Sequence, residues 1–389
     1  MDGVREVLQN LTRDKQWTNE KHLDLCRIAA PTFFEQERAK WMAAQFEELG
    51  YDAKIDRAGN VTALLKAAGE EPLVAVTAHL DTVLAPRSPD DISIHPDGSM
   101  RGPGVSDNGA GLAALLAIAK AMNESPAFRP AQARVVFAAN VCEEGEGNLS
   151  GMRYLCGHSP LAQRIRSFLI LDGPATDHIT AQALASRRFE VIFSGPGGHS
   201  WSDFGIGNPV HALSRAVALF ADSQKRGESP RASYNFGLIE GGVSINSIPT
   251  SARAKLDIRS ESPERIDELA VLLTASVERA LESENVPISA GKVSAKIREI
   301  GSRPGGQLAG DAPLLRYLRA VNGHLSVRSR VDCASTDANI PLSLGIPAVS
   351  IGAGGQGGGA HTPDEWFHPE GREIGLKRIV LTLCLMLAE

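Results

Sequence analysis

The sequence lacks the features of a secreted or membrane-spanning protein. Its five cysteines are scattered and include no Cys-x-x-Cys pair, which favours free, buried thiols in a reducing compartment over disulfides. No uninterrupted apolar run reaches the roughly 18 residues that a membrane span needs. The first 22 residues mix acids and bases without the apolar core of a signal peptide. These absences predict a cytoplasmic protein with no membrane partner.

An excess of basic residues is also lacking. The chain has 40 Lys and Arg against 46 Asp and Glu, a formal net charge of -6. Nucleic acids and anionic membranes select basic surfaces, so neither is expected as a partner. No Gly-x-Ser-x-Gly elbow is present, which argues against a serine hydrolase of the type that carries one.

The order of apolar patterns predicts an α/β fold. At 389 residues the chain is too long for one ordinary core, which suggests two domains or one domain with an insertion. Strand-like and helix-like segments alternate in the first half. The expected strands are 61–65, 73–77, 134–141 and 167–171, and the expected helices are 34–50 and 112–122. Such alternation predicts a three-layer domain around a mostly parallel sheet.

The segment 184–302 has a different pattern and reads as an inserted α+β unit. Alternation of apolar and polar residues predicts strands at 188–194, 252–259 and 292–300. One helix is expected to begin at the Asn-Pro pair 208–209, where the Asn can cap it, and a second to span 263–284. The larger domain would then comprise 1–183 and 303–389 and end in a helix over 374–387.

Polar side chains follow three of the predicted strands. His79 and Asp81 follow one strand, Glu143 and Glu144 a second, and Asp172 a third. In parallel sheets ligands gather at the carboxyl ends of the strands, so these side chains are expected at one edge of the sheet. Each residue alone also fits a turn, a packed histidine or a solvated pair; it is the ordered set that indicates a site.

Five residues form a candidate set of metal ligands: His79, Asp107, Glu144, Asp172 and His361. Two imidazoles and three carboxylates without a thiolate suit a catalytic site for zinc, or for manganese or cobalt. Five ligands are too many for one catalytic zinc. They suit two divalent ions if one carboxylate bridges them.

Neighbouring acids need different roles in such a site. Asp81 lies two residues after His79 on an extended strand, so both point to one face. The Asp81 carboxylate is predicted to accept the second ring N–H of His79 and thereby to fix its tautomer. Of Glu143 and Glu144, one can bind metal while the other takes a proton from the water that the metal activates.

Short motifs are distributed over essentially the whole chain: 30–32 (APT), 79–83 (HLDTV), 104–111 (GVSDNGAG), 143–145 (EEG), Asp172, 197–200 (GGHS), 246–249 (NSIP), 335–339 (STDAN) and 361–362 (HT). In these motifs the chain resembles the zinc metallopeptidase family that includes carboxypeptidase G, aminoacylase, acetylornithine deacetylase and peptidase T. The resemblance implies that Asp107 bridges the two ions. His79 and Asp172 would hold one ion, and Glu144 and His361 the other. Asn-Gly after Asp107 departs from the Met-Lys or Lys-Ala of many relatives, with no effect expected on metal binding.

The resemblance assigns further roles. Glu143 becomes the general base, and the inserted unit a lid that commonly also mediates dimerisation. His199 would stabilise the oxyanion, within its own subunit or across a dimer. Arg259, at the end of an alternating strand, is the candidate clamp for a substrate carboxylate, with Asn246 expected nearby to polarise the scissile carbonyl.

The sequence therefore predicts a two-metal, exopeptidase-like hydrolase that cleaves amide bonds of small peptides. A deacylase or deacetylase of N-acylated amino acids on the same fold stays open as an alternative. So does a catalytically inactive metal-binding protein. The physiological metal, the substrate and the formation of a homodimer through the lid stay open as well.

Overall fold

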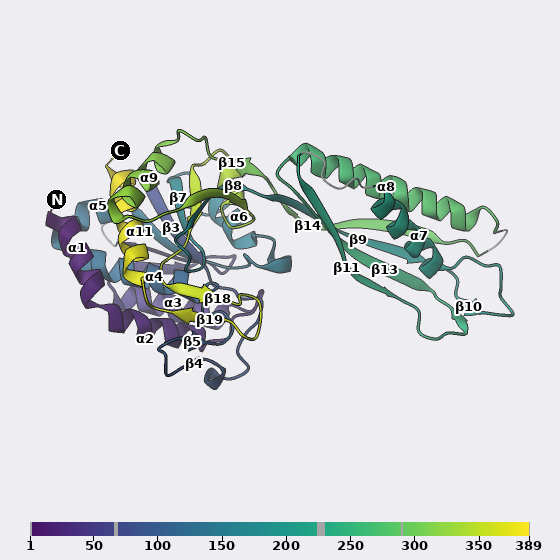
Figure 1. The fold of residues 1–389 in the computed structure, drawn as a ribbon, viewed down its shortest axis with the longest axis horizontal. Helices are drawn as coiled ribbons and strands as arrows, with labels where there is room; N and C mark the ends of the chain where they lie inside the picture. Colours follow the sequence, from purple (N-terminus) through teal and green to yellow (C-terminus); the bar gives the residue numbers. More distant parts are fainter. Residues whose placement is uncertain (1, 66–68, 224–229, 289–290, 389) are drawn as a thin grey trace. The chain divides into compact units, whose positions relative to one another are not determined.

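The computed structural model describes residues 2–65, 69–223, 230–288 and 291–388. It divides into two compact units, one made of Met1–Ala183 and Gly306–Glu389 and the other of Leu184–Gly305. The second unit is the teal and green segment from β9 to β14 in Figure 1. The insertion expected from the sequence, 184–302, begins at the same residue and ends three residues earlier.

The first unit is built on a nine-stranded sheet with a parallel centre. The central strands are β6 (Val135–Asn140), β3 (Leu73–His79), β7 (Ile165–Leu171) and β17 (Ala348–Ile351), each parallel to its neighbour. Antiparallel strands complete the sheet: β1 (Tyr51–Ile55), β2 (Val61–Leu65), β8 (His178–Ala183) and β15 (Gly306–Gln307), while β16 (Arg330–Ala334) runs parallel to β8. The predicted α/β fold with a mostly parallel sheet is confirmed.

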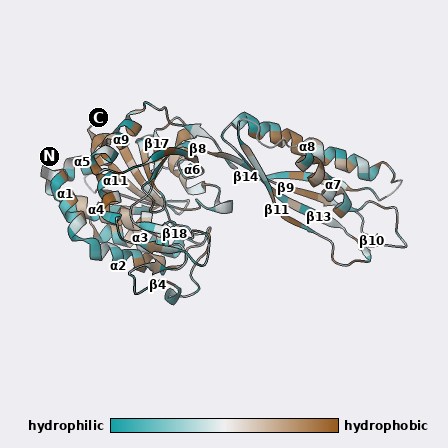
Figure 2. Cartoon of the chain, viewed as in Figure 1, coloured by the Kyte–Doolittle hydropathy of each residue, from teal (hydrophilic) through white to brown (hydrophobic). Residues whose placement is uncertain are grey.

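Helices cover this sheet because its strands are apolar on both faces. Every residue of β3 is buried, and the nearly all-apolar helix α4 (Gly109–Asn123) packs on it, while α3 (Gln36–Glu48) packs on β1 and β2. The hydropathy colours show the brown central strands of this unit (Figure 2). The remaining helices are α1 (Asp2–Arg13), α2 (Lys15–Cys26), α5 (Arg129–Gln132), α6 (Ser150–Gly157), α9 (Pro313–Leu325), α10 (Asn339–Ser343) and α11 (Arg372–Leu387). A small antiparallel sheet joins β18 (Gln356–Gly358), β19 (Trp366–His368), β5 (Met100–Arg101) and β4 (Ser93–Ile94).

The second unit is an antiparallel sheet with two helices packed on it. Its strand order is β11 (Ala232–Gly241), β13 (Ser251–Ser260), β9 (Ala185–Ser194) and β14 (Ser294–Arg303). The helices are α7 (Pro209–Asp222) and α8 (Pro263–Asn285), and a short pair joins β10 (Gly198–His199) to β12 (Ser247–Ile248). Alternate residues of β13 are buried, which is the period-two pattern that predicted this strand. As expected, the Asn208 side chain caps α7 by accepting from the backbone N–H of Val210 and His211.

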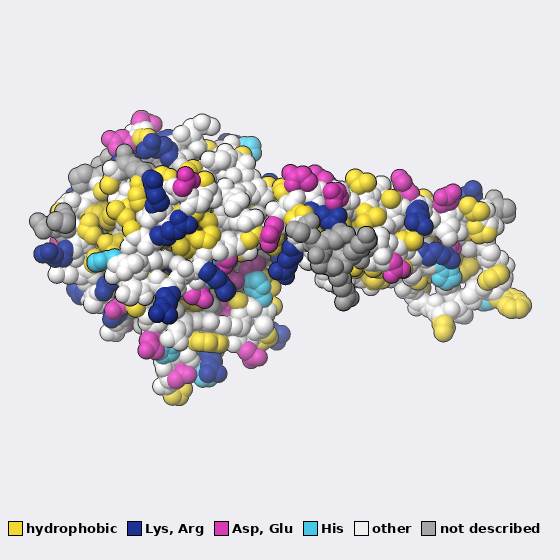
Figure 3. Space-filling model, turned by 45° about the horizontal axis from the view of Figure 1, so that its top comes forward, with side chains coloured by type: hydrophobic (Ala, Val, Ile, Leu, Met, Phe, Trp, Pro, Cys, Tyr) yellow, Lys and Arg dark blue, Asp and Glu magenta, His cyan; other side chains and the backbone are white. Residues whose placement is uncertain are grey.

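The surface carries charges of both signs. Basic and acidic side chains are interspersed on the face shown in Figure 3, in keeping with the modest net charge of -6. The five cysteines are free, and three of them are buried. None of the helices in the described parts of the chain is long and apolar enough to cross a membrane.

Candidate metal centre

The parallel strands bring the predicted polar residues to one edge of the sheet. β6, β3 and β7 lie side by side in that order. His79 is the last residue of β3, Asp172 directly follows β7, and the pair Glu143 and Glu144 lies just beyond β6. Neighbouring parallel strands end at the same edge, so residues distant in sequence meet there.

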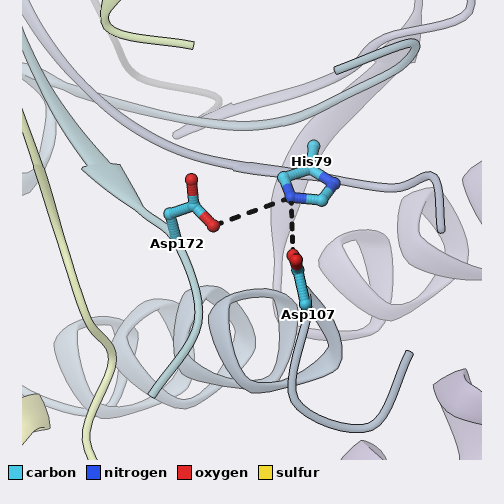
Figure 4. Close-up of side chains that lie close together, drawn as sticks. All are labelled: His79, Asp107 and Asp172. Atoms are coloured by element: carbon cyan, nitrogen blue, oxygen red, sulfur yellow. Dashed lines mark ion pairs between the residues drawn. The ribbon is translucent and has the colours of Figure 1, made fainter. Parts of the chain in front are cut away.

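A first trio of candidate ligands consists of His79, Asp107 and Asp172 (Figure 4). His79 Nε2 lies 3.1 Å from Asp107 Oδ1 and 3.8 Å from Asp172 Oδ1. One potential ligand atom from each residue lies within 4.8 Å of the others. The imidazole is buried, whereas both carboxylates are partly accessible, so the site opens on the carboxylate side.

A second trio shares Asp107 with the first and adds Glu144 and His361. His361 Nε2 lies 3.1 Å from Asp107 Oδ2 and 2.8 Å from Glu144 Oε1. The two oxygens of Asp107 therefore face two different imidazoles. This is the arrangement needed by a carboxylate that bridges two cations.

The tautomer of His79 is fixed by a backbone carbonyl. Nδ1 lies 2.9 Å from the main-chain oxygen of Asp81 but 3.7 Å from its carboxylate Oδ1. A carbonyl oxygen can only accept, so Nδ1 donates its hydrogen there and Nε2 is directed at the carboxylates. The prediction that the Asp81 carboxylate accepts this hydrogen is wrong, because the turn after β3 presents the backbone oxygen instead.

The Asp81 carboxylate orients the glutamate pair. It is fully buried. Its Oδ1 accepts the backbone N–H of Glu143 at 2.9 Å, and its Oδ2 accepts that of Glu144 at 2.9 Å and the Thr32 hydroxyl at 3.0 Å. Asp81 therefore holds in place the loop that carries the candidate base.

The electrostatics of the centre favour bound cations. Burial alone would lower the pKa of His79, but the neighbouring carboxylates of Asp107, Asp172 and Asp81 raise it well above its usual value. Asp107 and Glu144 raise the pKa of His361 to about 10. The carboxylates around both imidazoles therefore stabilise positive charge at this site, which favours the binding of a divalent cation.

The donor set fits two divalent ions. Asp107 Oδ1 is buried and, in the described part of the chain, makes no well-aligned hydrogen bond, so a cation would satisfy it. Imidazole and carboxylate donors without a thiolate suit zinc, manganese or cobalt.

Comparison with known proteins places the chain in a family. Residues 75–384 match the model of "Peptidase family M20/M25/M40". The chain belongs to this family. The resemblance predicted from the motifs is thus confirmed, and the chain is placed among the metallopeptidase hydrolases.

Individual relatives agree with this assignment. A Pyrococcus abyssi protein provisionally named as a LysW-lysine/LysW-ornithine hydrolase is 38% identical over 123 residues, which is 31% of this chain and 32% of that protein. A tripeptidase from Staphylococcus aureus has the same fold, with a TM-score of 0.77, 20% identity and coverage of 96% of this chain and 99% of that one. A Bacillus subtilis protein described as a dinuclear metal-binding peptidase of the M20 family also has this fold. Its TM-score is 0.69 and its sequence identity 17%, and the match covers 97% of this chain and 99% of that one.

The structure of this M20 chain adds two residues that sequence reasoning did not assign. The buried carboxylate of Glu365 accepts three backbone N–H groups in the loop that ends at Asp107. Asp337, in the STDAN motif, accepts from Asn140 Nδ2 at 2.7 Å. Asp337 lies in a motif that carried the resemblance and Glu365 four residues after His361, yet spacing along the chain gives no indication of either contact.

In the second unit of this M20 chain, His199 and Asn246 lie at the same end of the sheet. The backbone N–H of Ser200 donates to the backbone oxygen of Asn246 at 3.0 Å. His199 Nδ1 accepts the backbone N–H of Trp201 at 3.2 Å and that of Ser202 at 3.3 Å. In the neutral ring the hydrogen therefore resides on Nε2, which leaves Nε2 as a donor.

Arg259 lies at the opposite end of β13 from these two residues. Its Nε donates to Asp257 Oδ2 at 2.7 Å, and it pairs with Ser186 of β9, whereas Ser251 pairs with Ser194. At about 3.3 Å per residue, the eight steps from Ser251 to Arg259 span roughly 26 Å. The prediction that Asn246 lies near Arg259 is therefore wrong within one copy of this unit, because the connecting strand is fully extended.

Proposed function

We propose that this chain is a two-metal, exopeptidase-like hydrolase that cleaves the amide bonds of small peptides. The observation that carries the proposal is that Asp107 belongs to both ligand trios and that its two oxygens face His79 and His361. The likeness to structures described as a tripeptidase and as a dinuclear metal-binding peptidase supports it.

The roles follow from the two trios. His79 and Asp172 would hold one ion, Glu144 and His361 the other, and Asp107 both. Zinc suits this donor set best, with manganese and cobalt also compatible. When bound, the two ions polarise the substrate carbonyl and lower the pKa of a water molecule.

Glu143 would move the proton. It is 5% exposed, and its backbone N–H donates to the Asp81 carboxylate. One of its carboxylate oxygens lies within 4.8 Å of a potential ligand atom of His79 and of Glu144. Its carboxylate would take the proton from the attacking water and pass it to the leaving nitrogen, a contribution of about 10²–10⁴-fold.

The second unit would bind the substrate. The Nε2–H of His199 is suited to donate to the oxyanion, a contribution of roughly 3–4 kcal/mol, with Asn246 beside it. Arg259 would hold a substrate carboxylate through its planar fork. Since roughly 26 Å of strand separates them, a small substrate cannot contact Arg259 and His199 of the same copy, so a homodimer is part of the proposal.

Replacement of the base tests the proposed mechanism. Glu143→Gln should bind two metal ions per chain, as measured by elemental analysis, and lose about 10²–10⁴-fold in kcat. Asp107→Ala, by contrast, should lose both ions. Near-normal turnover by Glu143→Gln would refute the assignment of the base.

A substrate panel tests the reaction class. Dipeptides, tripeptides and N-acetyl amino acids should be compared after chelation and reloading with zinc, manganese or cobalt. Peptide hydrolysis that is abolished by the chelator and restored by metal is expected. Preferred cleavage of the N-acetyl compounds would make the protein a deacylase, and no cleavage at all would make it an inactive metal-binding protein.

A further inference from the structure

Glu365 lies in the loop between His361 and β19, and its side chain is 2% exposed. Its Oε2 accepts the backbone N–H of Gly104 at 2.7 Å. Its Oε1 accepts the N–H groups of Ser106 and Asp107, each at 2.8 Å. A single carboxylate thus binds three amides of the loop that precedes α4.

These amides need a partner because their loop is neither helix nor strand. A buried N–H without an acceptor costs about 1–3 kcal/mol. The loop also packs closely on its neighbours at Gly104. Gly104 has a φ of 75°, and a Cβ there would lie 2.5 Å from Thr82 Cγ2. The shape of the loop therefore depends on the Glu365 carboxylate.

The same residue connects the loops that supply two ligands of the second trio. Asp107 is one of the three residues whose amide it binds, and His361 lies four positions before it in its own loop. His361 has a φ of 65°, a conformation that is uncommon for a residue other than glycine. The two loops are also joined through the backbone, where the Gly102 N–H donates to the Glu365 carbonyl oxygen at 2.9 Å.

We propose that Glu365 is a positioning residue that sets the metal affinity of the Asp107–Glu144–His361 trio. Its three hydrogen bonds fix the position of Asp107 relative to His361, so that Asp107 Oδ2 and His361 Nε2 would face one ion. The inference rests on the metal centre of the proposed function and is independent of the substrate.

Metal titration of the Glu365→Gln variant tests the proposal. The amide NH₂ would face at least one backbone N–H, so a hydrogen bond is lost without a change in size. Metal-free protein titrated with Co²⁺ should bind two ions in the wild type. In the variant one of the two affinities should fall by about 10–100-fold, the usual effect of losing a partner behind a ligand.

Two further variants separate hydrogen bonding from charge. Asp364→Asn removes one negative charge from the neighbouring, exposed position and should leave both affinities unchanged. Glu365→Asp keeps the charge but is one methylene shorter, so it should weaken Co²⁺ binding as Glu365→Gln does. Equal weakening by Asp364→Asn, or wild-type affinity in Glu365→Asp, would overturn the proposal.

Hydrogen exchange on the metal-free wild type tests the hydrogen bonds directly, even if the variants do not fold. The amides of Gly104, Ser106 and Asp107 should be protected although they belong to a loop. Exchange as fast as in an exposed loop would contradict the proposal. A wild-type protein that binds two ions but hydrolyses no peptide would refute the proposed function and leave this inference standing.

Discussion

Among single residues, Asp337 has a buried carboxyl group whose ionisation is unfavourable in the folded protein. It is 1% exposed, and its Oδ1 has no hydrogen-bond partner among the described residues. Burial raises its pKa to about 7, and Asp172 and Asp81 add to this shift while His79 and the bond from Asn140 oppose it. Without metal, Asp337 is therefore neutral over most of the acidic range.

This shift predicts a pH-dependent stability for the metal-free protein. The folded-state pKa of about 7 lies above the ordinary value of 3.8, so the neutral form stabilises the fold below pH 4. That contribution, up to about 4 kcal/mol at 1.36 kcal/mol per pKa unit, is lost as the pH rises to about 7. In denaturant unfolding at pH 4 to 8, the wild type should lose stability relative to Asp337→Asn. Parallel curves for the two proteins would contradict the assignment. Bound cations should reduce the difference by favouring the ionised form.

At the scale of elements, the first turn of α4 is pressed against its neighbours. A Cβ at Gly111 would lie 2.3 Å from Asn108 Oδ1 and 2.8 Å from the carbonyl oxygen of Leu171. Asn108 caps the helix by accepting the Gly111 N–H, and its amide donates to the same carbonyl at 2.8 Å. This close approach joins the loop of Asp107 to the end of β7, directly beside Asp172.

The contact predicts opposite effects for two glycine substitutions. Gly111→Ala should destabilise the protein by roughly 1–3 kcal/mol through overpacking, although alanine is the better helix former. Gly323→Ala in α9, where a Cβ would meet nothing within 4 Å, should instead stabilise it by about 0.4–1 kcal/mol. Denaturant unfolding of both variants is the measurement. Stabilisation by Gly111→Ala would show that the first turn is not tightly packed.

Elements with a regular period could be predicted from the sequence, whereas their contacts could not. The predicted strands and helices of the first half end within three residues of the observed bounds. Strand β11 was missed, although Tyr234, Phe236 and Leu238 alternate with Asn235 and Gly237 in its sequence. The edge of the sheet that carries His79 and Asp172 followed from strand order. The Asp81 carbonyl contact and the three bonds to Glu365 depend on turn geometry, which spacing does not encode.

At the scale of the whole molecule, two units with separate hydrophobic cores divide the proposed work. The first unit carries both ligand trios and Glu143. In the second unit, Arg259 pairs with Ser186, close to the residue Leu184 at which the unit begins. His199 pairs with Ser247, which lies beyond the other end of β13. A substrate of a few residues cannot span a full strand, so under the proposed function a complete site would take residues from two copies.

This division predicts complementation between two defective variants. His199→Ala and Glu143→Gln should each be nearly inactive alone. When they are mixed, unfolded and refolded together, half of the dimers should be mixed. One of the two sites in each mixed dimer then joins an intact Glu143 to the partner's intact His199, so about a quarter of wild-type activity should return.

Glu143→Gln mixed with Asp172→Ala is the control: both changes lie in the first unit, so no site regains both groups and no activity should return. If the first mixture also stays inactive while light scattering shows dimers, His199 acts within its own chain. One chain would then have to bind its substrate with residues from both ends of the extended strand β13.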